Sequence, residues 1–331
     1  MKKIVLIVIA ALAAAIVVAT VVVSCVFTLI RTRYSEGVLP GSAELAAAVT
    51  YQRVLLLGVD GAGNYFKDVD TPNFDRIFGE GSVNYEGWSQ YPTTSAHNWT
   101  AMLHGVRYQT HGVNNLVAER KKYAKTQYPS IFKVCADAYP QAQMIALTSW
   151  YPINYGIIED IDSVIKYNGP KDIKEDPLLT ETDKRFKDAF VEELRGGLDP
   201  KIAFMYFGQV DEYGHEEGRG QDFDEAMQRV DGYIGEVYDQ YVANGWVEDT
   251  LFVFVTDHGH RPHGGHGLNS KSERTVTVAV AGAKGNVIKG TPGKTVTQDV
   301  ASIILYGLGI AQPDTWESRV PYGIFNTLPT E

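Results

Sequence analysis

Cysteine is almost absent from this chain of 331 residues. Of its two cysteines, Cys25 lies in an apolar N-terminal stretch and Cys135 stands alone in the rest of the chain. The segment after that stretch can therefore form no internal disulfide, and we expect no disulfide-linked partner. A zinc site built from several cysteines is also excluded. Within "FKVCADAY", Cys135 is expected to be a small buried apolar side chain.

Positive charge is also scarce: 30 lysines and arginines face 40 aspartates and glutamates, for a formal net charge of −10. Proteins that bind nucleic-acid polymers normally carry a basic surface that displaces counterions from the phosphates. We therefore expect no nucleic-acid polymer as a partner. Some of the surplus acidic residues are instead candidate metal ligands.

Two common active-site motifs are missing. No G-x-S-x-G sequence occurs, which disfavours a serine hydrolase of the α/β type. "GVDGAGNYF" begins like a dinucleotide-binding turn, but Phe66 replaces the last glycine of G-x-G-x-x-G.

Residues 4–30 form a long stretch without a charged side chain. As a helix this stretch would be about 40 Å long, enough to cross a hydrocarbon core of about 30 Å. A cleaved signal peptide is the alternative, although its apolar region usually has only about 7–15 residues. "VVSC" resembles a lipoprotein cleavage box, but "VFTLI" continues the apolar stretch beyond it. We predict an uncleaved membrane anchor over residues 1–30. Basic residues on both sides of the stretch leave its orientation undecided.

The rest of the chain divides into a membrane-proximal linker, 31–50, and a catalytic domain, 51–331. Strands are predicted where short apolar runs are continuous, as expected when both faces of a sheet are covered. Five runs meet this description: 53–60, 142–149, 201–208, 250–257 and 274–282.

Helical patterns lie between these runs, for example at 180–197, where Phe186, Phe190 and Leu194 are spaced by four residues. A second helix is predicted at 222–245. Strands that alternate with helices predict an α/β domain with a largely parallel sheet. The region 150–200 begins with a polar, irregular segment and is interpreted as a cap or insertion at the site.

Three predicted strands end next to an aspartate: Asp60, Asp211 and Asp257. One such residue is easily explained as a turn or helix-cap residue. However, His215 follows Asp211 by four residues and His258 follows Asp257 directly. Ligands of open parallel sheets bind outside the carboxyl ends of the strands, so these side chains are expected to converge.

Carboxylates and imidazoles without thiolates are typical of a catalytic zinc site. Asp60, Asp257 and His258 make one set of donors, and Asp211, His215 and one later histidine make another. Two such sets favour a two-metal site, in which ions about 3.5–4 Å apart hold the attacking and leaving oxygens of a phosphoryl transfer.

"YPTTSAHNWTAMLHG" (91–105) contains the candidate nucleophile. Pro92 and Thr93 indicate a turn, and the residues from Ser95 onward predict a short helix that ends at Gly105. A hydroxyl at that helix start lies where the dipole and free N–H groups favour an anion. A role for Thr94 or Ser95 as a simple N-cap is the alternative.

Together these segments resemble the alkaline phosphatase superfamily, and most closely its type I phosphodiesterase/nucleotide pyrophosphatase branch. The resemblance rests on matching segments in the family's order between about residues 53 and 313. These segments are "LLLGVDGAG", "TPNFDRIFGEG", "YPTTSAHNWTAMLHG", "HGVNN", "VDEYGH", "TDHG", "GGHG" and "DVASIILYGLGIAQP".

The resemblance implies a three-layer sandwich around a mostly parallel sheet, and two zinc ions, with Mn²⁺ as an alternative. The implied ligands are Asp60, Asp257, His258 and the Ser95 oxygen for one ion, and Asp211, His215 and His266 for the other. Ser95 matches the family nucleophile, because it lies three residues after the proline and ten before the closing glycine. The diesterase branch usually has threonine there, and this departure bears on diester preference. The family asparagine that donates to phosphate is assigned to Asn115, with Asn114 left open.

We therefore expect a membrane-anchored hydrolase that cleaves phosphodiester or pyrophosphate bonds of small phosphorylated substrates through a phospho-Ser95 intermediate. The resemblance implies that its catalytic domain lies outside the cytoplasm. A phosphomonoesterase and a phosphoethanolamine or phosphoglycerol transferase are the alternatives. The full set of candidate ligands disfavours a non-catalytic binding protein, and the surroundings of Ser95 lack the motif of sulfatases. His97, His104 and His111 are expected to be ordinary helix or turn residues, and His260 and His263 solvated loop residues.

Overall fold

Seven strands form the central sheet of the computed structural model, which describes residues 35–120 and 127–330. The strand order is β2-β7-β6-β1-β5-β3-β4. The pairs β6–β1–β5–β3–β4 are parallel, whereas β7 is antiparallel to both β6 and β2. The strands are β1 (Arg53–Val59), β2 (Ser82–Trp88), β3 (Met144–Thr148), β4 (Val164–Asn168), β5 (Ile202–Phe207), β6 (Thr250–Thr256) and β7 (Thr275–Ala281).

Each predicted apolar run is a strand within two residues at either end, and the mostly parallel α/β sheet is confirmed. Two strands, β2 and β4, were not predicted. They are the two edges of the sheet, and their side chains are only partly buried.

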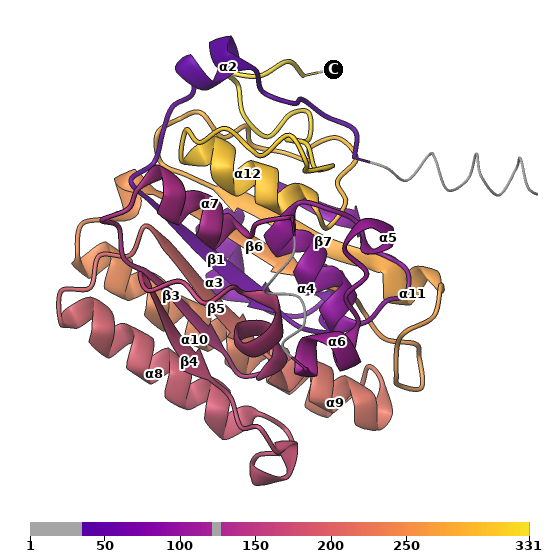
Figure 1. Ribbon diagram of the computed structural model, residues 1–331. Helices are drawn as coiled ribbons and strands as arrows, with labels where there is room; N and C mark the ends of the chain where they lie inside the picture. The colour runs from indigo at the N-terminus through magenta and orange to yellow at the C-terminus, as the bar shows by residue number, and fades with distance from the viewer. Residues whose placement is uncertain (1–34, 121–126, 331) are drawn as a thin grey trace, which may run out of the picture. The chain divides into compact units, whose positions relative to one another are not determined.

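Helices cover both faces of the sheet, as Figure 1 shows for α7 and α12 on one face and α8 and α10 on the other. Successive residues of β1 point to opposite faces of the sheet. Leu56 packs in the core beneath α4, α7 and α12, and Leu57 packs in the core beneath α3, α8 and α10. The α-helices are α2 (Ser42–Ala46), α3 (Pro72–Phe78), α4 (Ser95–His104), α5 (Tyr108–His111), α6 (Asn115–Glu119), α7 (Ile131–Ala138), α8 (Thr180–Arg195), α9 (Gln209–Glu217), α10 (Gln221–Ala243), α11 (Lys271–Arg274) and α12 (Asp299–Gly307). The described residues also form a π-helix, η3 (Ile153–Ile157), and the short 3-10 helices η1 (Tyr65–Lys67), η4 (Ile173–Glu175) and η5 (Val247–Asp249).

The two helices predicted from periodicity correspond to α8 and α10, and the nucleophile segment forms α4. Phe186, Phe190 and Leu194 are buried on the inner face of α8, as their spacing predicts. The region 150–200 contributes β4 and α8 to the central layers, so this part of it is not a separate cap.

The predicted anchor, residues 1–30, lies outside the described residues, as does the start of the linker. Val38, in the described part of the linker, forms an antiparallel bridge with Val320. Within 35–120 and 127–330, no helix combines the length and apolar character needed to cross a membrane.

Candidate active site

Strand register brings the first two predicted ligands together. In the parallel pair β1–β6, Val59 lies opposite Thr256. The next residue of each strand, Asp60 and Asp257, therefore emerges at the same carboxyl end of the sheet. Both carboxylates are buried, with exposed fractions of 1% and 0%.

The inner cluster consists of Asp60, Asp257 and His258. His258 Nε2 lies 3.3 Å from Asp60 Oδ1 and 3.2 Å from Asp257 Oδ2. Neither of these carboxylate oxygens has a hydrogen-bond partner among the described residues. An unsatisfied buried carboxylate oxygen is costly, so two that face one imidazole nitrogen point to a common cation.

The second oxygen of each carboxylate is held by hydrogen bonds. Asp60 Oδ2 accepts from Trp99 Nε1 at 2.8 Å and from the Tyr206 hydroxyl at 2.6 Å. Asp257 Oδ1 accepts from the backbone N–H groups of Gly61 and His258 at 3.0 and 2.9 Å. These bonds orient the free oxygens toward His258. Trp99 and Tyr206 were not predicted as site residues. The spacing of four residues places Trp99 on the same face of α4 as Ser95, a signal that could have found Trp99.

The outer cluster consists of Asp211, His215 and His266. Asp211 and His215 are one helical turn apart on α9, and His215 Nε2 lies 3.2 Å from Asp211 Oδ2. His266 Nε2 comes from the loop after β6 and lies 3.1 Å from His215 Nε2 and 3.7 Å from Asp211 Oδ1. The spacing "VDEYGH" thus places its acid and histidine on one face of α9, a helix that was not predicted from the sequence.

The two clusters adjoin. The rings of His258 and His266 stack with centroids 3.8 Å apart, and His258 Nε2 is 3.9 Å from Asp211 Oδ1. Donor atoms of Asp60, Asp257 and His258 lie close enough to share one ion, and those of Asp211, His258 and His266 do so as well.

The spacing of the donors fits zinc. Zinc bonds of about 2.0–2.1 Å in a tetrahedral arrangement place neighbouring ligand atoms about 3.3 Å apart. The contacts of His258 with Asp60 and Asp257, at 3.3 and 3.2 Å, have this length. The contacts of His215 with Asp211 and His266, at 3.2 and 3.1 Å, have it too. That these atoms bind metal stays a prediction, which this geometry supports.

Burial and the neighbouring charged groups strongly shift the pKa values of the three aspartates in the site. Burial, followed by the charge of Asp211, raises the pKa of Asp60 to about 8. The pKa of Asp257 is raised well above its usual range by the same two effects and by Asp60. Burial alone would also raise the pKa of Asp211, but the surrounding histidines, His266 first, hold it well below its usual range. Bound cations would offset this concentration of acidic groups.

His260 is the main correction to the sequence analysis. We interpreted it as a solvated loop residue, but it is only 1% exposed. Its Nε2 lies 2.9 Å from Asp211 Oδ1. Its ring fills a space beside Gly61 and Gly214, where an added Cβ would lie 2.7 and 2.4 Å from that nitrogen. His260 is therefore buried next to Asp211 of the outer cluster. His263, in contrast, is exposed, as predicted.

Ser95 is the hydroxyl residue that faces the inner cluster. It is the first residue of α4, and its Oγ lies 3.5 Å from His258 Nε2. The hydroxyl of Thr94 is instead hydrogen-bonded to His97 Nδ1. Although Thr94 is the N-cap residue, its side chain accepts no bond from the helix backbone. This arrangement favours Ser95 over Thr94 as nucleophile.

The two asparagines of "HGVNN" have different partners. Asn114 caps α6, with its Oδ1 accepting from Val117 N at 2.9 Å. Asn115 Oδ1 accepts from Ala96 N at 3.1 Å, next to Ser95. This contact leaves the amide nitrogen of Asn115 as a donor beside the nucleophile, so the geometry favours Asn115 over Asn114.

The other histidines near α4 have local partners. His97 is bonded to Thr94, and His111 Nε2 donates to His97 O at 3.1 Å. The ring nitrogens of His104 lie 2.7 Å from Tyr128 O and 3.0 Å from Ile157 O. These contacts fit their interpretation as helix and turn residues.

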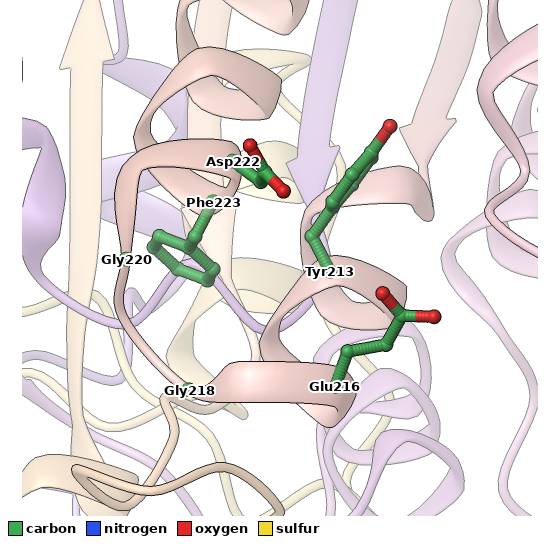
Figure 2. A pocket seen from close by; sticks show the side chains of 6 residues that line it. All are labelled: Tyr213, Glu216, Gly218, Gly220, Asp222 and Phe223. Carbon is green, nitrogen blue, oxygen red and sulfur yellow. The ribbon is translucent and has the colours of Figure 1, made fainter.

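A small pocket lies beside α9 (Figure 2). Tyr213 and Glu216 of α9 line one side, and Asp222 and Phe223 at the start of α10 line the other. The ring of Phe223 is 6.1 Å from that of His260. None of the lining residues is a predicted ligand.

Part of the chain matches a known protein family. Residues 137–272 match the family model of type I phosphodiesterases and nucleotide pyrophosphatases. This match covers less than half of the chain, and its family belongs to the alkaline phosphatase superfamily, which the sequence motifs also resemble. The match indicates a phosphoester hydrolase. The matched residues include Asp211, Asp257, His258 and His266, whereas Asp60 and Ser95 lie before them.

Solved structures of the superfamily share the fold at low identity. Human ectonucleotide pyrophosphatase/phosphodiesterase 5 matches with a TM-score of 0.64 and 12% identity, over 79% of this chain and 96% of that chain. The murine protein, solved as an inactive variant in complex with AMP, gives 0.61 and 13% over the same shares. A 2-O GAG sulfatase gives 0.62 and 13%, over 80% of this chain and 72% of that one. A search of curated proteins found no match. At such identities the likeness shows the fold alone.

Proposed function

We propose that this protein is a two-zinc hydrolase of phosphodiester or pyrophosphate bonds in small phosphorylated substrates. The observation that carries the proposal is the pair of adjoining Asp/His clusters at the carboxyl ends of β1, β5 and β6, with donor spacings that suit zinc. Mn²⁺ has similar oxygen and nitrogen ligands and is the alternative ion.

Ser95 is the proposed nucleophile. Two bound cations would lower the pKa of its hydroxyl and neutralise the charge on the phosphoryl oxygens. Ser95 Oγ attacks phosphorus in line, the Oγ–P bond forms, and the bond from phosphorus to the leaving alcohol or phosphate breaks. Water then hydrolyses the phosphoserine and regenerates Ser95. The position of Ser95 at the first turn of α4 supports this role, because the helix dipole favours negative charge there.

Asn115 is the proposed donor to a phosphoryl oxygen. Its Oδ1 accepts a hydrogen bond from Ala96 N, which holds the side chain beside the nucleophile and leaves the amide N–H groups to donate to a phosphoryl oxygen. A donor placed in advance where charge develops stabilises the transition state without reorganisation.

Serine at position 95 keeps a phosphomonoesterase as the second candidate, since the resemblance associates serine with phosphatases and threonine with diesterases. A phosphoethanolamine or phosphoglycerol transferase would fit the N-terminal stretch. We further propose that residues 1–30 anchor the protein in a membrane, with the catalytic domain outside the cytoplasm. The uncharged segment 4–30 supports the anchor.

The test combines metal content with substrate preference. We expect the gently purified protein to hold two zinc ions and to cleave bis-(aryl) phosphates faster than mono-aryl phosphates. Two ions with a strong monoester preference would overturn the diesterase assignment and leave the metal site intact. Protein without zinc or manganese, and without any activity that either metal restores, would overturn the proposed function itself.

A further inference from the structure

Residue 93 is tied to the loop that carries His266 by three hydrogen bonds. The carbonyl oxygen of Thr93 accepts from His266 Nδ1 at 2.6 Å. The Thr93 hydroxyl accepts from Gly267 N at 2.9 Å and donates to Leu268 O at 2.7 Å. One residue thus engages three consecutive residues of the loop. It lies only two positions before Ser95 in the chain.

The hydrogen bond to the Thr93 carbonyl decides which nitrogen of His266 is free. Because Nδ1 donates to a carbonyl, the neutral imidazole has its lone pair on Nε2. That nitrogen faces His215 and Asp211 in the outer cluster. A metal-binding histidine commonly has its second nitrogen fixed in this way, which sets the tautomer and the ring orientation.

The loop needs such a constraint because its own backbone is permissive. Gly264, Gly265 and Gly267 all have positive φ, at 87°, 71° and 103°. Glycine-rich segments of this kind have high conformational entropy unless other groups hold them. The two bonds of the Thr93 hydroxyl hold the loop directly after His266. Glu273 adds a third support, with Oε1 accepting from Leu268 N at 2.8 Å.

Thr93 is itself firmly placed: its exposed fraction is 0%. The hydroxyl contacts neither a predicted ligand side chain nor Ser95, so its action is indirect. We propose that Thr93 is a positioning residue that couples the nucleophile segment to the outer metal ligand His266. This inference rests on the proposed function, because it assumes that the outer cluster binds a cation.

Thr93→Val tests the coupling, since valine has nearly the same shape and lacks both hydroxyl bonds. We expect the zinc affinity of the outer cluster to fall about ten- to hundredfold, the usual cost of losing an outer partner of a metal ligand. The inner cluster should retain its affinity. Stepwise competition with a chelator, followed on the full-length protein, measures the two affinities separately.

Two matched variants make the result specific. Thr93→Ser keeps the hydroxyl and should restore most of the affinity. Thr100→Val makes the same change at a buried threonine of α4 whose hydroxyl has no partner among the described residues, and should leave both affinities unchanged. Thermal unfolding of the metal-free variants checks that each is folded. If Thr93→Val is unfolded, Thr93→Ala takes its place with Thr100→Ala as its control, and a fall in outer affinity for Thr93→Ala alone supports the role.

The inference fails if folded Thr93→Val binds both ions as tightly as the unchanged protein. It also fails if the serine and valine variants lose affinity equally, because the hydroxyl would then be irrelevant. Both results presuppose that the unchanged protein binds two ions. If it binds none, the proposed function has failed instead, so the two failures are distinguishable.

Discussion

The two clusters of the site are built in different ways. The inner cluster follows two central strands, so the hydrogen-bonded register of β1 and β6 places Asp60 and Asp257 side by side. The outer cluster combines a helix with a glycine-rich loop, and the side chain of His215 is 45% exposed, whereas that of His258 is 0% exposed. Ligands at the ends of central strands are held rigidly and shielded from solvent. Ligands on a loop depend on further contacts, such as those of Thr93. We therefore expect the outer ion to be held less tightly.

The largest effect is expected for Ser95→Ala. Removing the nucleophile should lower turnover by more than about 10⁴-fold, in line with nucleophile deletions in other covalent hydrolases. Both ions should stay bound, because the Asp and His ligands of both clusters remain. Turnover and zinc content of the same preparation are the measurements. Retained activity would move the nucleophile to Thr94 or remove the covalent step.

Asp257→Asn tests the inner cluster. The variant weakens a central ligand and should lower activity by at least about 100-fold, because the electrostatic contribution of a metal is worth several kcal/mol. Asp257 is not a ligand of the outer cluster, so the outer cluster should still bind an ion. Zinc content and kcat/KM check this. Asp162→Asn, at an exposed acid, is the control and should change neither quantity. Loss of both ions together would show that the clusters are not independent.

Three histidine variants test which histidine of the loop after β6 is a ligand of the outer ion. His266→Ala should lower the outer affinity by more than about 100-fold, since removing a ligand exceeds the ten- to hundredfold cost of an outer partner. His260→Ala should lower it by about tenfold through its contact with Asp211. His263→Ala should have no effect. A large loss for His263→Ala and none for His266→Ala would make the assignment of the loop wrong.

The smallest effect concerns Asp299, a buried carboxylate remote from the predicted ligands in sequence. Unlike Asp60 and Asp257, it has donors to both oxygens: Val296 N at 3.0 Å to Oδ2, and Arg319 N at 3.1 Å to Oδ1. Burial still raises its pKa from 3.8 to about 7. Because the folded state keeps a proton that the unfolded state releases, this group makes the free energy of unfolding decrease as pH rises from about 4 to about 7.

Asp299→Asn should remove that part of the pH dependence while costing some stability at acidic pH, where Val296 N loses an acceptor. Urea unfolding at pH 5 and pH 7.5 measures the difference, with Asp162→Asn as the control. An unchanged difference between the two pH values would mean that Asp299 does not titrate in this range.

Strands were predictable from the sequence where both faces of the sheet are covered. β1, β5 and β6 are continuous apolar runs because α-helices pack on both sides of them. β4, "VIKYN", and β2, "SVNYEGW", are edge strands with partly exposed side chains, so they lack that signal. A continuous apolar run therefore indicates a strand that is buried on both faces, and it does not detect strands at the edge of the sheet.

The candidate site was partly predictable for a similar reason. Asp60, Asp257 and His258 stand at strand ends, and a sheet brings strand ends together whatever the loops do. His260 was misjudged because a loop sequence does not show which of its side chains turn inward. Its burial depends on the space beside Gly61 and Gly214, which lie far away in the chain. Trp99 and Tyr206 were missed because their role is a contact with Asp60 across the fold.

By itself, the sequence determined the chemistry available to this protein: an acidic chain without paired thiols, with carboxylates and imidazoles after buried strands and hydroxyl residues at a helix start. This information comes from residue types and their spacing along the chain, which do not depend on how distant segments pack. The tertiary structure decided which atoms face each other. It favoured Ser95 over Thr94 and Asn115 over Asn114, and it placed His260 next to Asp211, because hydrogen bonds between distant segments orient these side chains. The same kind of contact, between Thr93 and the loop of His266, links the nucleophile segment to the outer cluster.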